Sequence, residues 1–164
     1  MARVVVTPEA GLADALVTHR PSHAACFGSP SRPAVAPDVS HVLLQSFHDI
    51  AEPRAGHVAP TRADADALIA FLRAWDGTAP LLLQCWMGVS RSTAALLIAG
   101  TARGADPAAL ARTLRERSPA ATPNPLMVAH ADDALALGGR LRAAAAAIGR
   151  GTVPVAEPFA LDVP

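Results

Sequence analysis

The sequence has no lysine, and its 14 basic residues, all of them arginine, are balanced by 14 acidic residues. A chain without net charge offers no broad cationic surface to a nucleic-acid backbone or an anionic membrane. Polar residues also interrupt every apolar run well short of the roughly 18–20 residues that a membrane helix needs. We therefore expect a soluble protein with neither a nucleic acid nor a membrane as its partner.

Cysteine is also scarce, with only Cys26 and Cys85 present and no Cys-x-x-Cys pair. The six histidines form no i, i+4 pair beside an acidic residue. These absences argue against a disulfide framework and a zinc site, and we expect no metal and no cofactor. The apolar stretch before Pro8 is shorter than the roughly 7–15 residues of a secretory signal, so we expect a cytoplasmic location.

The length of 164 residues suits one domain, which we place at residues 1–150. Three prolines (154, 158 and 164) punctuate the remaining segment, so residues 151–164 are expected to be extended or disordered.

Short apolar or β-branched runs alternate with helical patterns along this domain. Strands are expected at residues 3–6, 23–27, 41–47 and 80–84, and helices after Pro8, at 61–75, from Ser90, from Asp106-Pro107, from Asn124-Pro125 and at 140–148. This alternation predicts an α/β fold with a mainly parallel sheet of about four to five strands flanked by helices. Such sheets bind ligands at the carboxyl ends of their strands, and Cys85 follows the last strand expected.

The segment after that strand contains the candidate catalytic and binding residues. It reads Cys85-Trp86-Met87-Gly88-Val89-Ser90-Arg91-Ser92 and connects a buried strand to a helix. Several backbone N–H groups can converge there at the positive end of a helix dipole, so the loop is suited to bind a phosphate. Gly88 permits backbone angles closed to other residues, and Arg91 offers two donors in a planar fork. The same positive field favours the thiolate of Cys85, which is the nucleophilic form.

This segment resembles the signature of the cysteine-dependent protein tyrosine phosphatases, His-Cys-x5-Arg-Ser/Thr with a glycine three residues after the cysteine. Four of the five fixed positions match, which chance would produce on the order of once in a thousand such sequences. The segment from Ser118-Pro119 to Pro123-Asn124 also resembles one of the dual-specificity branch. The resemblance implies a phosphate monoester hydrolase that works through a phosphocysteine on Cys85, with protein phosphotyrosine favoured and a small phosphate ester still open.

The resemblance also implies a general acid on a loop upstream of the nucleophile, and Asp49 stands at a suitable position. There it would protonate the leaving oxygen and later activate water. Asp49 could instead be a turn-forming residue, in which case Glu52 is the substitute acid. His48 is a candidate for orienting Asp49. Ser92 could donate a hydrogen bond to the sulfur when the phosphocysteine is hydrolysed.

One position departs from the signature, because Gln84 stands where the family has histidine. Glutamine cannot carry a positive charge, so the thiolate would be less stabilised and activity lower. Two alternatives therefore stay open: a catalytically impaired module that binds phosphotyrosine or phosphate, and a sulfurtransferase of the rhodanese kind that carries sulfur as a persulfide.

Several residues also have plain structural interpretations. Cys26, on a buried strand, is expected to be structural, with a protective disulfide to Cys85 as the alternative. Trp86 and Met87 either pack beneath the loop or form the lip of the pocket, where they would suit an aromatic phosphoester. The absence of lysine from the loop disfavours highly charged phosphoinositides as substrates.

Overall fold

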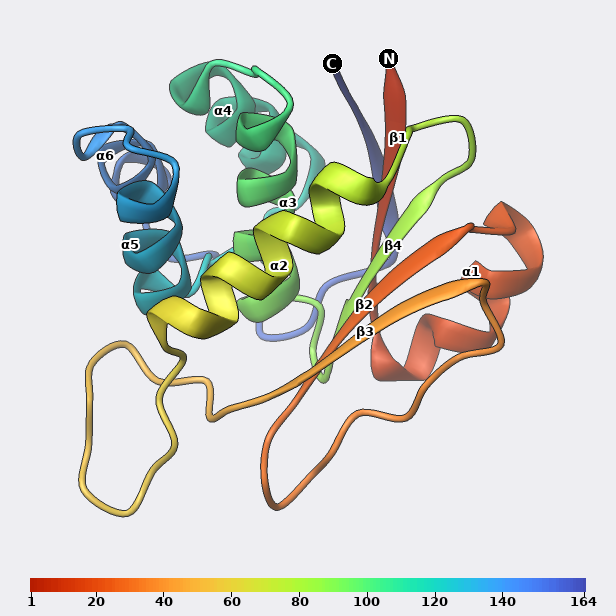
Figure 1. The fold of residues 1–164 in the computed structure, drawn as a ribbon, viewed down its shortest axis with the longest axis horizontal. Helices are drawn as coiled ribbons and strands as arrows, with labels where there is room; N and C mark the ends of the chain where they lie inside the picture. The colour runs from red at the N-terminus through yellow and green to blue at the C-terminus, as the bar shows by residue number, and fades with distance from the viewer.

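The centre of the fold is a five-stranded sheet, which the computed structural model of residues 1–164 shows in the order β3-β2-β4-β1-β5 (Figure 1). Its strands are β1 (Ala2–Pro8), β2 (His23–Gly28), β3 (His41–Ser46), β4 (Leu81–Cys85) and β5 (Phe159–Val163). The first four run parallel, so their carboxyl ends meet at one edge of the sheet. Every residue of β2 and β4 is buried, as expected of parallel strands covered on both faces. The predicted α/β class and strand number are confirmed.

The sequence predicts an extended or disordered tail at residues 151–164, but part of this segment belongs to the sheet. Residues 159–163 form β5, which pairs antiparallel with β1 and brings the two termini together (Figure 1). Leu161 and Val163 are buried while Asp162 between them is exposed, the alternation of an edge strand with one face on the core. The strand before the phosphate-binding segment, β4, is therefore the last of the parallel strands rather than the last of the sheet.

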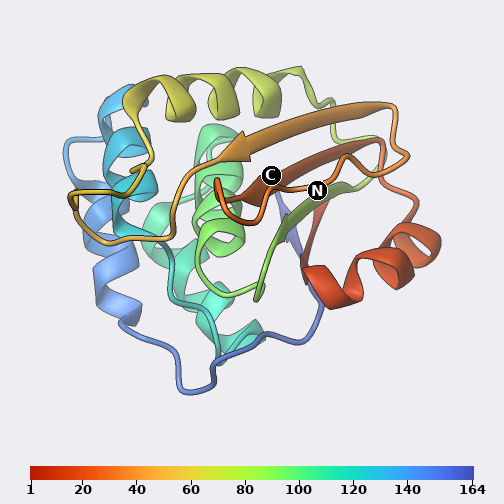
Figure 2. The same ribbon diagram turned by 90° about the horizontal axis from the view of Figure 1, so that it is seen from below.

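Helices cover the two faces of the sheet unequally. The helices are α1 (Leu12–His19), α2 (Arg62–Ala74), α3 (Arg91–Ala102), α4 (Pro107–Arg117), α5 (Pro125–Ala134) and α6 (Arg140–Ile148). Only α1, which follows a 3-10 turn at Glu9–Gly11, lies on one face, and the other five lie on the opposite face (Figures 1 and 2). None of them combines the length and apolar character that crossing a membrane would require.

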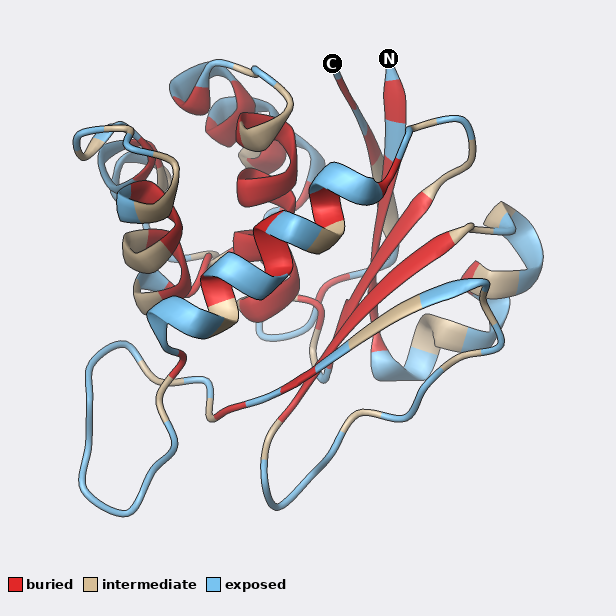
Figure 3. Cartoon of the chain, viewed as in Figure 1, coloured by how far each residue is buried: buried red, intermediate tan, exposed pale blue.

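Local signals set the starts of the long helices. Thr61 and Asp64 form the predicted capping box, with the Asp64 carboxylate accepting from the Thr61 N–H at 2.7 Å and Thr61 Oγ1 accepting from the Asp64 N–H at 3.2 Å. Asp106 caps α4 and Asn124 caps α5, each followed by proline at the first helical position. The buried face of α2 points at the core while its other face is exposed (Figure 3).

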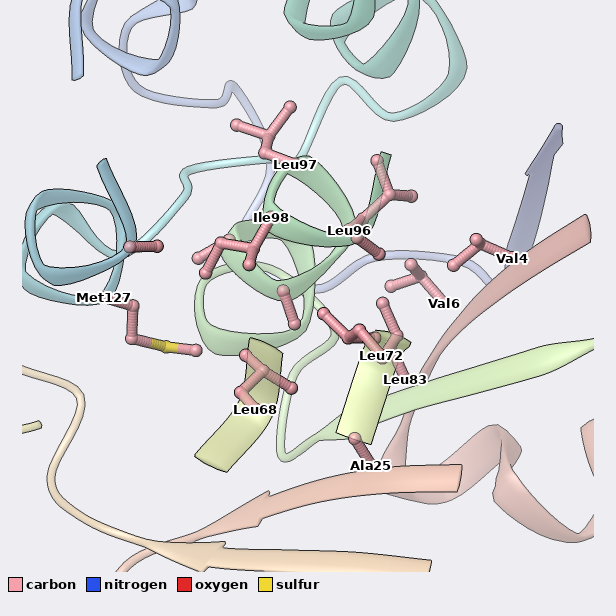
Figure 4. Close-up of a cluster of buried hydrophobic side chains, with 14 of the residues drawn as sticks. Val4, Val6, Ala25, Leu68, Leu72, Leu83, Leu96, Leu97, Ile98 and Met127 are labelled. Atoms are coloured by element: carbon pink, nitrogen blue, oxygen red, sulfur yellow. The ribbon is translucent and has the colours of Figure 1, made fainter. Parts of the chain in front are cut away.

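The main core surrounds α3, which is buried from Arg91 to Thr101 because the sheet, α2, α4 and α5 enclose it. Leu96 and Ile98 of this helix meet Val6 and Leu83 of the sheet and Leu68 of α2 (Figure 4). An enclosed helix cannot slide or tilt without opening cavities, which cost stability in proportion to their volume. The amino terminus of α3 is therefore held firmly against the carboxyl edge of the sheet.

Candidate active site

Cys85 ends β4 in the middle of the sheet. Its backbone pairs with Pro8 of β1 on one side and Phe27 of β2 on the other. The residue is 2% exposed, and its Sγ lies 3.1 Å from the hydroxyl of Ser92 in the first turn of α3. The thiol is thus fixed by the sheet behind it and the helix in front, with a hydroxyl within hydrogen-bond reach of the sulfur.

The loop of residues 86–90 is tied down through its carbonyl groups. Four backbone N–H groups from distant segments donate to them: Glu9 to Trp86 (3.1 Å), Ala156 to Met87 (3.0 Å), Thr122 to Val89 (2.9 Å) and Asn124 to Ser90 (3.2 Å). Each peptide unit is planar and trans, so the next N–H points opposite to each fixed carbonyl. The N–H groups of Met87, Gly88, Ser90 and Arg91 therefore point away from those four segments. The backbone N–H groups of residues 86–90 donate to no acceptor within the protein.

Gly88 is required by this loop for two reasons. Its φ is +67°, a left-handed conformation that side chains disfavour. A Cβ at this position would also lie 2.9 Å from the backbone nitrogen of Pro8, which belongs to a buried strand and cannot move aside. Both the positive φ and the close approach of β1 therefore require glycine at this position, as the sequence predicts.

Arg91 is the buried cation of the site, with 5% of its surface exposed. Its Nη1 donates to the carbonyl oxygen of Gly28 at 2.7 Å and to that of Phe47 at 3.0 Å, at the ends of β2 and β3. Its Nε is buried and has no hydrogen-bond partner. This arrangement holds one edge of the guanidinium and leaves a buried Nε donor unsatisfied, although buried donors are nearly always satisfied.

Asp49 lies on the loop after β3 and is held at the same pocket by two hydrogen bonds. The hydroxyl of Ser90 donates to its Oδ1 at 2.6 Å, and the Nδ2 of Asn124 donates to the same oxygen at 2.7 Å. Asn124 also donates to the carbonyl of Ile50 at 3.1 Å, while its Oδ1 accepts from the first turn of α5. The carboxylate is exposed yet fixed in position.

Two other residues of the Asp49 loop lie away from this site. The Nδ1 of His48 accepts from the N–H of Val58 at 2.8 Å, and its ring meets His57 edge-on. Ser90 and Asn124 orient Asp49 instead, so the structure does not give His48 the predicted orienting contact. Glu52 is exposed and does not line the pocket.

The pocket in front of the thiol has a volume of about 300 Å³ and is lined by Cys85, Asp49, Arg91 and apolar side chains. Trp86, Met87 and Val89 form part of this apolar lining, and Pro154 completes it from the C-terminal segment. Trp86 is 49% exposed, so it stands at the rim rather than beneath the loop. The guanidinium carbon of Arg32 lies 4.3 Å from the centre of its ring.

Cys26 and Gln84 lie on the opposite face of the sheet. Cys26 pairs with Gln84 across the strands and packs in the small core beneath α1, whereas Cys85 belongs to the main core. Successive side chains of a strand alternate between faces, so the two thiols cannot meet and both are free. This rules out the disulfide alternative, and burial raises the pKa of the Cys26 thiol to about 12.

Besides the amide of Asn124, which it marked only as a helix cap, the sequence pattern did not identify three contributors to the site. Two are the carbonyl groups of Gly28 and Phe47 that hold Arg91, and the third is Pro154 in the supposed tail. A backbone carbonyl carries no residue signature, and Pro154 comes close only because β5 returns to the sheet. No group of three or more histidine, cysteine or acidic side chains is placed to hold a metal ion.

The fold of this chain resembles that of known proteins, but its sequence has little similarity to theirs. No protein-family model and no curated protein sequence matches the chain. Two solved structures resemble it, the dual-specificity phosphatases human DUSP28 and DUSP15. DUSP28 superposes with a TM-score of 0.57 at 20% identity, covering 82% of this chain and 94% of the other. DUSP15 gives a TM-score of 0.56 at 17% identity, covering 85% and 88%.

The chain has the fold of the dual-specificity phosphatases. In this phosphatase fold the loop of residues 86–90 lies at the carboxyl end of a central strand and at the amino terminus of a buried helix. The amino terminus of α3, the guanidinium of Arg91 and the loop N–H groups that lack a protein acceptor each add positive potential to the surroundings of this loop. Positive potential of this kind favours an anionic ligand.

Proposed function

We propose that the protein is a cysteine-dependent phosphatase that hydrolyses phosphate monoesters, with protein phosphotyrosine as the favoured substrate. The observation that carries the proposal is that Cys85, Arg91 and Asp49 line one pocket. The apolar rim formed by Trp86 and Pro154 favours an aromatic ester over a charged sugar or inositol phosphate.

In the first step the Cys85 thiolate attacks phosphorus and the bond from phosphorus to the ester oxygen breaks. The protonated carboxyl of Asp49 gives its proton to the departing oxygen, so the alcohol leaves neutral. Arg91 and the loop N–H groups hold the three equatorial phosphoryl oxygens, where negative charge is spread in the transition state. The product of this step is a phosphocysteine on Cys85.

In the second step the Asp49 carboxylate removes a proton from water, and the water oxygen attacks phosphorus. The bond from phosphorus to sulfur breaks, inorganic phosphate leaves, and the thiolate is regenerated. The Ser92 hydroxyl, 3.1 Å from the sulfur, is placed to donate a hydrogen bond to the departing thiolate. Ser92 would therefore act mainly on the second step.

The test is the hydrolysis of para-nitrophenyl phosphate and of phenyl phosphate in the presence of EDTA. Cys85→Ser should abolish turnover of both esters. Asp49→Asn should lower kcat by about 10²- to 10⁴-fold for phenyl phosphate, whose leaving group needs the proton, and less for the nitrophenyl ester. Glu52→Gln, on the same loop but outside the pocket, is the matched control and should retain full activity.

Two other outcomes would replace the proposal. Phosphotyrosine binding without turnover would favour the binding module, in which Gln84 reflects lost catalysis. Sulfur transfer from thiosulfate that persists in Asp49→Asn and fails in Cys85→Ser would favour the sulfurtransferase, because a persulfide carrier needs no general acid.

A further inference from the structure

An apolar chamber of about 420 Å³ lies beside the proposed active site, between α5 and α6. Its walls are prolines and small side chains: Pro123, Pro125, Val128, Ala129, Ala145 and Ala146. The one charged lining residue, Arg142, is already paired with Asp133 at 2.7 Å and donates to the carbonyl of Ala129. The chamber therefore presents apolar surface to whatever enters it, with its single cation satisfied.

The chamber and the pocket at Cys85 each adjoin a third hollow, a wider trough of about 740 Å³, with which they share lining residues. Asp49, Ser90 and Pro154 line both the trough and the catalytic pocket. At its other end the trough shares Thr122 and Pro125 with the chamber. One path thus runs from the nucleophile, past the proposed general acid, to the apolar chamber.

The trough is lined by polar and apolar groups alike, which decides between the possible occupants. Thr152 brings a hydroxyl to its lining, and Arg150 adds a cation that pairs with no acidic side chain, while Ile50 and Val153 bring apolar side chains. An alkyl tail would use only the apolar part of the trough and would leave its polar groups without partners. A polypeptide backbone, with a donor and an acceptor at each residue, suits the trough.

We propose that the chamber is a substrate subsite, which binds an apolar side chain of a phosphorylated polypeptide whose phosphate occupies the pocket at Cys85. The backbone between the two residues crosses the trough, where Arg150 favours an acidic residue. This assignment rests on the proposed function, because it takes the pocket at Cys85 as the phosphate site. It predicts that a substrate is recognised by an apolar residue at a fixed spacing from its phosphotyrosine.

The chain provides a matched pair of variants for the test. Ala146 and Ala147 are neighbouring exposed residues of α6, and only Ala146 lines the chamber. Leucine is a good helix former, so Ala146→Leu and Ala147→Leu should both fold. Ala146→Leu fills part of the chamber, whereas Ala147→Leu adds the same side chain outside it.

The probes are phosphotyrosine peptides with an otherwise alanine and serine background, in which one leucine is moved through each flanking position. Binding to the Cys85→Ser protein is measured together with kcat/KM of the active protein. We expect one leucine position to raise affinity about tenfold, the scale of burying one apolar side chain. Ala146→Leu should remove that gain, Ala147→Leu should keep it, and turnover of para-nitrophenyl phosphate should be unchanged in both.

Failure of this inference is distinguishable from failure of the proposed function. If para-nitrophenyl phosphate is hydrolysed but no leucine position matters, or if Ala146→Leu leaves the preference intact, the subsite is wrong and the phosphatase stands. If no turnover occurs but Cys85→Ser and wild type show the leucine preference and its loss in Ala146→Leu, the subsite stands without catalysis. Preference for octyl phosphate over every peptide, lost in Ala146→Leu, would overturn the peptide assignment in favour of a small amphipathic ester.

Discussion

Asn124 donates a hydrogen bond of 2.7 Å from its Nδ2 to Oδ1 of Asp49, a residue 75 positions earlier in the chain. The same side chain caps the amino terminus of α5 through its Oδ1, so one residue begins a helix and holds the proposed acid. The position of Asp49 therefore depends on the helix layer as well as on its own loop.

The two roles of Asn124 can be separated by substitution. Serine caps helices about as well as asparagine, so Asn124→Ser should keep the cap of α5 and lower the free energy of unfolding only through the lost bonds to Asp49 and Ile50, by about 1 kcal/mol. It removes the Nδ2 donor, and we expect about a tenfold fall in kcat with phenyl phosphate as Asp49 loses its fixed position. Asn124→Ala should show the same fall in kcat, and the loss of the helix cap should lower its free energy of unfolding by about a further 1 kcal/mol. Urea denaturation and steady-state kinetics measure both effects; full activity in Asn124→Ser would contradict the positioning role.

The parts of the site that the sequence could reveal are those that are contiguous in it. The residues from Cys85 to Ser92 are contiguous in the sequence, and their types and spacing predict a phosphate-binding loop without knowledge of the rest. The strands and caps could also be predicted, because the capping box at Thr61 and Asp64 is a local pattern. These features depend on interactions within a few residues.

The parts that could not be predicted depend on long-range contacts. The five residues of β5 are too short a run to predict a strand after Pro154 and Pro158. They form a strand because they pair with the edge of β1. Arg3 and Asp162 pair across this junction at 3.0 Å, which no local pattern indicates. Pro154 reaches the pocket for the same reason, since its chain must return to the sheet.

The two thiols should differ sharply in reactivity. Burial raises the pKa of Cys26 to about 12, so almost none of it is thiolate at pH 8. Iodoacetamide at pH 8 should therefore modify Cys85 and leave Cys26 untouched in the folded protein, as mass spectrometry of peptides would show. Inorganic phosphate should slow the reaction at Cys85 by occupying the loop. Modification of Cys26 at a comparable rate would mean that the core beneath α1 opens in solution.

Acid should destabilise the fold through His23. Its ring is buried against His41, with centroids 4.3 Å apart, and its pKa is lowered first by burial and then by the charge of His41, although Asp76 opposes this. The unfolded chain takes up a proton near pH 6.5, and folded His23 does so only at lower pH, so stability falls as pH drops below about 6.5. His23→Phe should flatten the slope of unfolding free energy between pH 7 and 5. His130→Gln, outside this stack, is the control and should leave the slope nearly unchanged.

Substitution of Arg115 should lower the free energy of unfolding, because its guanidinium donates hydrogen bonds to backbone carbonyls of two chain segments and so joins them. It donates to five of them: Ser118 (3.2 Å), Pro119 (2.8 Å), Ala121 (2.7 Å), Ile148 (3.1 Å) and Gly149 (2.9 Å). Lysine keeps the charge but cannot serve this fan of acceptors, since its donors radiate from one nitrogen. Arg115→Lys should lower the free energy of unfolding by about 2 kcal/mol, the scale of hydrogen bonds to a charged group. The exposed Arg112 on the same helix offers the control, and Arg112→Lys should change stability by less than about 0.5 kcal/mol in the same urea titration. Equal stability of Arg115→Lys and Arg112→Lys would show that the contacts of Arg115 with these carbonyl groups do not stabilise the fold. The segment held at Gly149 continues to Pro154, which lines the pocket at Cys85, so Arg115→Lys should also raise KM for aryl phosphates.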